Sequence, residues 1–230
     1  ERLQRSEHFS RIGQLASGIA HEVRNPLNLV NLSIDHLKAR YSPTAPRDRD
    51  EFAVILSNIK GEVQRLNTLM NNFLEYGKPL KLALEPTSLA GIIEDVLELA
   101  NEKLIEQKIE VEKRFSSTPE ILVDRRQIKT CILNIVLNAI QAMHQGGKLT
   151  VKTSLIGGIA SLAIGDTGIG IPPEDIHKVF EPYFTTKDAG IGLGLALTKR
   201  IVDEHGGHLK IESGGSGTVV SMELPVEREA

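Results

Sequence analysis

The first third of this chain contains two long runs of apolar residues spaced three or four apart, separated by a short break that contains two prolines. The first run, in residues 1–41, comprises Phe9, Ile12, Ala16, Ile19, Val23, Leu27, Val30, Ile34 and Leu37. The second, in residues 51–76, comprises Phe52, Ile55, Ile59, Val63, Leu66, Met70 and Phe73. This spacing places apolar side chains on one face of an α-helix. Because prolines interrupt a helix, the sequence predicts two helices joined by residues 42–50 as an antiparallel hairpin.

Two long apolar faces cannot be buried well by one hairpin alone. A second copy of the hairpin would cover them, so the sequence predicts a homodimeric four-helix bundle. Packing of both helices on the rest of the same chain is the alternative, and it leaves more apolar surface exposed.

The most informative polar residues lie on the first predicted helix, in the run Gln14–Leu29. His21 falls nearly opposite the apolar face, and Asn25 lies one turn later on the same side as His21. Pro26 removes a backbone donor and predicts a bend just beyond the histidine. An isolated exposed histidine is usually only a solvated side chain. Here Glu22 follows directly, and a carboxylate can hold one ring N–H and so direct the other nitrogen at an electrophile.

The helical period stops at residues 77–86, which contain Gly77, Pro79 and Pro86. We therefore predict three parts: a helical domain at 1–76, a linker at 77–86 and a second domain at 87–230. In the second domain, Ser88 and Asp124 are candidate N-caps, and helices are also expected at 172–179 and 192–204. The remaining pattern predicts strands at 109–115, 121–123, 148–155, 159–164, 208–213 and 217–224. The predicted fold is α+β: a helical hairpin followed by an α/β sandwich with helices on one face of a mixed sheet.

Three stretches of the second domain carry candidate chemistry. Asn134 and Asn138 lie one helical turn apart, and two amide oxygens can hold a hydrated Mg²⁺, although a pair of surface amides looks the same. Asp166 follows a strand and precedes Gly168 and Gly170. This is either an ordinary tight turn or a carboxylate that accepts a hydrogen bond from an exocyclic amine.

The third stretch places Gly190, Gly192 and Gly194 before a helix, where bare backbone amides form an anion site. No strand precedes these glycines in a βαβ unit and no Gly-Lys-Ser/Thr follows, so neither a dinucleotide fingerprint nor a P-loop is present. Between the last two stretches, residues 180–187 form either a surface loop or a lid over a nucleotide. In the second case Thr185, Thr186 and Lys187 would lie near the phosphates.

Composition narrows the classes further. A net charge of −3 argues against a nucleic-acid surface. Cys131 is the only cysteine, so no intrachain disulfide can form, and its apolar neighbours favour a buried, inert thiol in a reducing compartment. The sequence contains no apolar stretch of the ~20 residues that span a bilayer, so we expect no membrane contact by this fragment and a cytoplasmic location. The chain begins in charged helical sequence without Met, so we expect a fragment of a longer protein, and a membrane anchor outside this fragment is compatible with the sequence.

Taken together and in order, these motifs resemble the transmitter core of two-component sensor histidine kinases over essentially all 230 residues. The correspondence comprises an H box at 14–29, an N box at 134–142, a G1 box at 166–171, an F box at 180–187 and a G2 box at 190–195. The segments FTTK, at 184–187, and NAIQAM, at 138–143, are most similar to the nitrogen-regulation branch of the family.

The resemblance implies a dimerisation and histidine-phosphotransfer hairpin followed by an ATP-binding domain of the Bergerat (GHKL) type. His21 would be the phosphoacceptor, Glu22 the base that takes its proton, and Asn25 the residue that orients water to dephosphorylate a partner regulator. The resemblance further implies that Asn138 ligates Mg²⁺ with help from Asn134. It implies ATP contacts at Asn138, Asp166, Gly168, Gly170, Thr185, Thr186, Lys187, Gly190, Gly192, Gly194 and Leu195, with Asp166 binding the adenine amine.

The implied reaction is ATP-dependent self-phosphorylation followed by transfer to an aspartate of a response-regulator receiver domain, with phosphatase activity on the regulator. Ile191 stands where Ser or Thr often separates the last glycines, and the lid at 187–192 is short.

Three alternatives stay open. A GHKL ATPase of the chaperone, gyrase or mismatch-repair type would usually carry Glu at position 134, a nucleotide-binding scaffold would be expected to lose motif residues, and an enzyme acting mainly as a phosphatase fits Asn25 equally well.

Overall fold

A computed structural model describes residues 25–77, 80–186 and 192–226 of the chain. The chain separates into two compact units, Glu1–Pro79 and Leu80–Ala230. None of the helices in the described parts of the chain combines the length and the hydropathy that crossing a bilayer requires.

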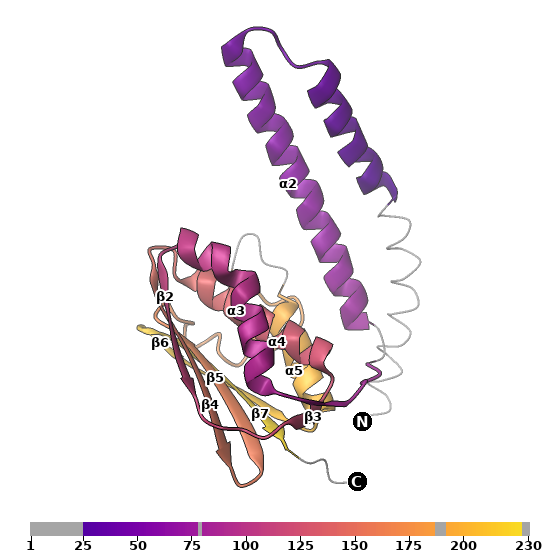
Figure 1. The fold of residues 1–230 in the computed structure, drawn as a ribbon. Coiled ribbons are helices and arrows are strands. Elements are labelled where there is room, and N and C mark those ends of the chain that lie inside the picture. The colour runs from indigo at the N-terminus through magenta and orange to yellow at the C-terminus, as the bar shows by residue number, and fades with distance from the viewer. Residues whose placement is uncertain (1–24, 78–79, 187–191, 227–230) are drawn as a thin grey trace. The chain divides into compact units, whose positions relative to one another are not determined.

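The first unit contains a helix over residues 25–40 and the helix α2, Pro46–Gly77 (Figure 1). The connection is shorter than the sequence predicts, because α2 begins at Pro46 and not near Glu51. Proline lacks a backbone N–H and has a fixed φ, and both properties suit the first position of a helix. The hydrogen bond from Arg49 N to Ala45 O, 3.0 Å long, begins the helical ladder. Lys60 of α2 forms a 2.8 Å ion pair with Asp35 of the first helix, which confirms the antiparallel hairpin.

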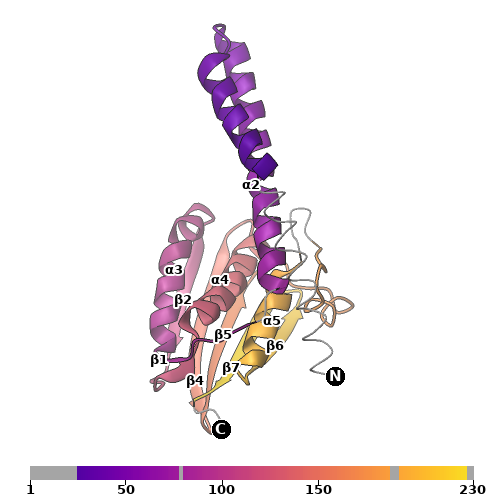
Figure 2. The same ribbon diagram turned by 90° about the vertical axis from the view of Figure 1, so that its right-hand side faces the viewer.

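The second unit is an α/β sandwich, as predicted. Its elements are β1 (Glu85–Thr87), α3 (Leu89–Glu106), β2 (Ile109–Phe115), β3 (Ile121–Val123), α4 (Arg125–Ala142), β4 (Gly147–Ile156), β5 (Ile159–Asp166), α5 (Gly194–Glu204), β6 (His208–Gly214) and β7 (Gly217–Pro225). A five-stranded sheet has the order β2-β4-β5-β7-β6, and all neighbours are antiparallel except β2 and β4. Figure 2 shows α3, α4 and α5 side by side on one face of this sheet.

The core of the second unit lies between the three helices and the sheet. It is built from alternate residues of the central strands and the inward faces of the helices, and it includes Ile92, Ile128, Ile132, Leu149, Leu162, Ile164, Ile201 and Met222. Several local predictions are confirmed. Ser88 and Asp124 cap α3 and α4 by accepting hydrogen bonds from Gly91 N and Gln127 N. Gly157 and Gly158 both have positive φ and form the β4–β5 turn.

Two predictions for the second unit are wrong. Residues 173–180 form successive turns and not a helix, with hydrogen bonds between residues three apart such as Asp175 N to Pro172 O. The last helix begins at Gly194, two residues later than predicted. In addition, the last two residues of the predicted linker, Glu85 and Pro86, belong to β1, which pairs with β3 through partners such as Glu85 and Val123. A three-residue strand is too short to show a period of two, so only its partner reveals it.

Candidate functional site

The helix α4 is the element that brings the candidate site residues together. Its apolar face is buried in the core, whereas Asn134 and Asn138 are half-buried on a different side, one turn apart. Asn134 Nδ2 donates a 3.3 Å hydrogen bond to the carbonyl oxygen of Gly194, the first residue of α5. The N-box asparagine therefore contacts the G2-box glycine, although 60 residues separate them in the sequence.

The C-terminal end of α4 meets the loop after β5, which contains Gly168 and Gly170. Ile169 N donates to Ala142 O over 3.2 Å. A methyl group on Gly168 would lie 2.6 Å from Ala142 O, so only glycine fits at this crossing. The Asp166 carboxylate fixes the same loop, since its Oδ1 accepts hydrogen bonds from Gly168 N at 2.8 Å and from Thr218 N at 3.3 Å.

Gly170 and Gly192 are also held against the protein's own backbone. Gly170 has φ +72°, and a Cβ there would lie 2.0 Å from Gly214 O. Gly192 has φ +67°, and a Cβ there would lie 2.3 Å from Phe184 O. Sequence reasoning attributes these glycines to nucleotide access. In the structure, glycine is required at both positions because the backbone of another segment passes close by. Contact of these glycines with a nucleotide stays a prediction.

We expect Gly170→Ala to lower the free energy of unfolding of the second unit by roughly 2–4 kcal/mol, because the new methyl would require both a strained φ and movement of the Gly214 backbone. Urea denaturation monitored by circular dichroism measures this. Gly215→Ala is the matched control, since a Cβ there would meet no described atom within 4 Å and its φ is unremarkable. Equal losses in the two variants would contradict the close approach of Gly170 to Gly214.

The beginning of α5 differs from the beginnings of α3 and α4. Its N-cap residue, Leu193, makes no side-chain hydrogen bond to the helix, whereas Ser88 and Asp124 cap the other two. The first N–H groups of a helix have no partner within the helix, and they carry the positive end of its dipole. The uncapped start of α5, beside Asn134, is therefore a suitable place for phosphate oxygens.

The F-box segment ends close to this helix start. Tyr183 has the unusual φ of +69°, and its N–H donates a 3.0 Å hydrogen bond to Gly192 O. Thr185 and Thr186 follow in the sequence and are exposed. Leu195 is half-buried in the first turn of α5. Lys178 lies over the Phe184 ring, 5.7 Å from its centre. Sequence reasoning missed the roles of Tyr183 and Lys178, because neither a positive φ nor a cation–aromatic contact leaves a pattern in the sequence.

Other predicted residues are placed as follows. Asn25 is the first described residue of the helix 25–40, and it is exposed. His21, Glu22, Lys187 and Gly190 lie outside the described residues. No cluster of three His, Cys, Asp or Glu side chains suited to a metal ion occurs among the residues that the structure describes.

Cys131 is buried on α4, as predicted, with its Sγ 3.9 Å from Thr198 O. Burial raises the pKa of this thiol, which keeps it in the weakly reactive protonated form.

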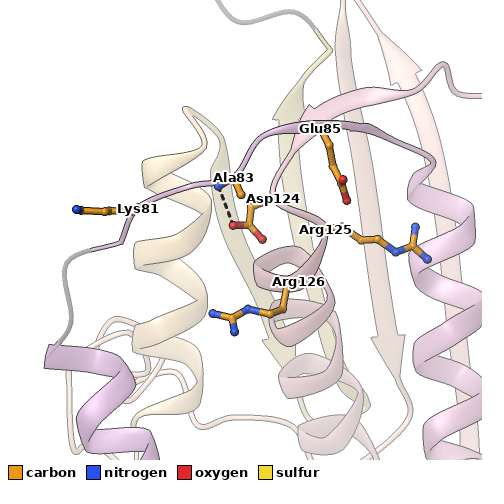
Figure 3. A pocket seen from close by; sticks show the side chains of 6 residues that line it. All are labelled: Lys81, Ala83, Glu85, Asp124, Arg125 and Arg126. Carbon is orange, nitrogen blue, oxygen red and sulfur yellow. Dashed lines mark hydrogen bonds between the residues drawn. The ribbon is translucent and has the colours of Figure 1, made fainter. Parts of the chain in front are cut away.

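A pocket of about 320 Å³ lies away from these residues, at the N-terminal end of α4. It is lined by Lys81, Ala83, Glu85, Asp124, Arg125 and Arg126 (Figure 3). None of the predicted site residues lines this pocket, so the candidate site is defined by the hydrogen bonds around α4 and α5 and not by this pocket.

Comparison with known proteins agrees with this geometry. Residues 123–228 match the family described as histidine kinase-, DNA gyrase B-, and HSP90-like ATPases, and residues 11–80 match the His kinase A (phospho-acceptor) domain. The match to this ATPase family thus lies within the second unit.

Individual relatives and solved structures identify the family more closely. The chain is 36% identical over 234 residues to sporulation kinase C of Bacillus subtilis (strain 168), which covers 100% of this chain and 53% of the relative. Among solved structures, full-length ShkA in complex with AMPPNP is similar with a TM-score of 0.79 and 27% identity, over 94% of this chain and 46% of ShkA. The histidine kinase ThkA in complex with the response regulator protein TrrA gives a TM-score of 0.71 and 30% identity, over 99% of this chain and 65% of the matched chain. The chain belongs to the histidine kinases of two-component systems, and it spans about half the length of the first curated relatives that it matches.

Proposed function

We propose that this chain is the phosphotransfer and catalytic core of a sensor histidine kinase, which transfers the γ-phosphoryl group of ATP to His21 and then to an aspartate of a response-regulator receiver domain. The observation that carries the proposal is the junction of α4 with α5. Asn134 contacts Gly194 there, beside a helix start without a side-chain cap. Residues 11–80 match a phospho-acceptor domain, and this match supports a histidine in that region as the acceptor of the phosphoryl group.

The proposed domain assignment is 1–76 for dimerisation and phosphotransfer, 77–86 for the linker and 87–230 for ATP binding. The boundary between the two compact units, Pro79 to Leu80, falls inside this linker. Since the histidine and the nucleotide belong to different units, the linker must allow them to meet.

The residues present fit ATP and Mg²⁺. Asn138 and Asn134 offer amide oxygens of the kind that accompany phosphate-bound Mg²⁺, and the Asp166 carboxylate can accept a hydrogen bond from the adenine amine. Mg²⁺, when bound, neutralises charge on the β- and γ-phosphates. The uncapped N–H groups of α5 would hold phosphate oxygens, with Thr185, Thr186 and Lys187 on the lid nearby.

The transfer itself needs one nitrogen and one base. A neutral His21 ring nitrogen attacks the γ-phosphorus, the bond to the bridging oxygen breaks, and ADP leaves with that electron pair. Glu22 holds the other ring N–H and takes its proton as the ring acquires positive charge. The receiver aspartate then attacks the phosphorus and frees the ring. We further propose that Asn25, exposed on its helix, orients the water that dephosphorylates the regulator.

Homodimerisation of the first unit is supported by the way its apolar faces are divided. On α2, Leu56 and Val63 are 4% and 5% exposed against the first helix, whereas Ile55, Ile59 and Leu66 on the adjoining side of the same stripe are 43–49% exposed. Val30 and Leu37 of the first helix, each 40% exposed, repeat this pattern. A second copy of the hairpin would cover both exposed edges.

We expect Ile59→Glu to weaken dimerisation by at least about 100-fold, because a charge at the buried centre of such an interface is costly. Sedimentation equilibrium over a range of concentrations measures this change. Val54→Glu is the matched control, since Val54 is 59% exposed and lies about 140° away around α2. If Val54→Glu dissociates the dimer and Ile59→Glu leaves it intact, the proposed interface is wrong.

Three further parts complete the proposal. The FTTK and NAIQAM wording supports the nitrogen-regulation branch. The regulator is identified only as a receiver domain, by analogy with ThkA and TrrA. A cytoplasmic location agrees with the single, buried cysteine.

Incubation with γ-labelled ATP and Mg²⁺ tests the proposal directly. We expect label on the protein that is labile in acid and stable in alkali, as a phosphohistidine is. Release of phosphate without labelled protein would favour an ATPase of the gyrase type, and tight ATP binding with neither would favour a scaffold. The hydrogen bond from Asn134 Nδ2 already argues against the first alternative, because a glutamate at this position could not donate it.

A further inference from the structure

Asp124 is the meeting point of three segments that are distant in the sequence, and Figure 3 shows its hydrogen bond with Ala83. Its backbone N–H donates a 3.0 Å hydrogen bond to His205 Nε2 at the end of α5. Its carboxylate accepts from Gln127 N through Oδ1 and from Ala83 N through Oδ2, both at 3.0 Å. One buried residue, 7% exposed, thus joins the linker region to the beginning of α4 and the end of α5.

His205, which accepts the hydrogen bond from Asp124 N, and the neighbouring Arg125 are themselves held in place. His205 is 3% exposed, and its Nδ1 is 2.7 Å from Ile201 O, one turn earlier in α5. Nδ1 must therefore carry the hydrogen, which leaves Nε2 as an acceptor for Asp124 N. The neighbouring Arg125 points toward α3, where its guanidinium contacts Asp95 at 2.8 Å. The beginning of α4 is thereby fixed to both flanking helices.

Of the described residues that follow α2, Ala83 is the first to be hydrogen-bonded to the body of the second unit. Two residues later, Glu85 begins the pairing of β1 with β3, directly before Asp124. Residues 78–82 separate this first anchor from Gly77, the end of α2. Without the hydrogen bond from Ala83 to Asp124, the first anchor would move to Glu85 and the separation would grow by two residues.

We propose that Asp124 is a positioning residue that anchors the interdomain linker at Ala83 and so sets the reach between the phosphoacceptor hairpin and the ATP-binding unit. The inference rests on the proposed function, in which His21 and the nucleotide lie on different units. Because Asp124 also begins α4, it fixes the linker to the same helix that carries Asn134 and Asn138.

The proposal predicts that the rate of phosphoryl transfer to His21 depends on Asp124, whereas the affinity for ATP does not. The effective concentration of one tethered group near another falls with roughly the three-halves power of the connecting length, so two added residues alone reduce the rate by somewhat under two-fold. Without the hydrogen bond, the direction in which the linker leaves the second unit is also no longer fixed, and this reduces the rate further.

Asp124→Asn tests the proposal, because asparagine is an equally good N-cap but offers only one acceptor for the two N–H groups. In the intact chain, we expect trypsin cleavage after the exposed Lys81 to accelerate about five-fold or more. We expect the initial rate of self-phosphorylation at saturating ATP to fall about two-fold or more. The Kd for ATP should stay within about two-fold and the Tm within about 2 °C, since the cap is retained.

Ala83→Pro removes the same hydrogen bond from the other side, because proline has no N–H, and Ala83→Ser is its control. The Pro variant should reproduce both changes, the Ser variant neither, and the double variant Asp124→Asn with Ala83→Pro should be no slower than the slower single variant. Faster cleavage after Lys81 with an unchanged labelling rate would overturn the proposal. So would a fall in rate that is accompanied by a matching loss of ATP affinity. Failure of the unmodified chain to label at all would instead count against the proposed function.

Discussion

Replacing His21 with glutamine is expected to reduce incorporation of labelled phosphate from ATP by more than about 10³-fold. Glutamine has a similar size and can hydrogen-bond, but its amide nitrogen is not a nucleophile, so no phosphoryl–enzyme bond can form. Binding of ATP should be unchanged, because every residue proposed to contact the nucleotide lies between Asn134 and Leu195 in the second unit. Filter-bound label and equilibrium binding of a fluorescent ATP analogue measure the two quantities separately.

His36→Gln is the matched control for this experiment. His36 lies on the helix at 25–40, where its ring and the Tyr41 ring make an edge contact at a centroid distance of 5.9 Å. The same substitution there tests whether the hairpin tolerates loss of an imidazole. Label that persists in the His21 variant and disappears in the His36 variant would place the phosphoacceptor elsewhere.

Asp166→Asn is expected to weaken ATP binding roughly 10- to 100-fold with little change in folding. An asparagine oxygen can still accept the hydrogen bonds from Gly168 N and Thr218 N that hold the loop after β5. The other carboxylate oxygen becomes an NH₂ group, which can only donate, and it would face the exocyclic amine of adenine, which also donates. A buried donor left without an acceptor costs about 1–3 kcal/mol, which is the expected loss.

Two comparisons separate recognition from folding in this case. Asp166→Ala should lower both ATP affinity and Tm, because it also removes the acceptor for the loop. Asp95→Asn, at a half-buried position of α3, should leave ATP binding unchanged although Arg125 and Lys129 hold the pKa of the Asp95 carboxyl below its ordinary value. Binding of GTP, whose base presents an oxygen in place of the amine, should improve relative to ATP in the Asp166→Asn variant. Equal weakening of both nucleotides would show that Asp166 does not read the base.

Much of the architecture could be predicted from the sequence because it is encoded locally. The three-to-four spacing predicted the helix at 25–40 and α2, the side chains of Ser88 and Asp124 cap helices that begin one residue later, and Gly157-Gly158 forms the β4–β5 turn. Each of these features depends on residues within a few positions of one another. The order of the five motifs also pointed to the family by resemblance, and comparison with relatives confirmed it.

The tertiary structure decided which of these segments meet, because such contacts join residues far apart in the chain. The hydrogen bond from Asn134 to Gly194 spans 60 residues, the one from Asp124 to His205 spans 81, and no local pattern encodes either. Likewise, the backbone that crowds Gly170 belongs to Gly214, so the need for glycine there was visible but its cause was not. Periodicity and capping determine elements, whereas packing of those elements determines which polar groups become partners.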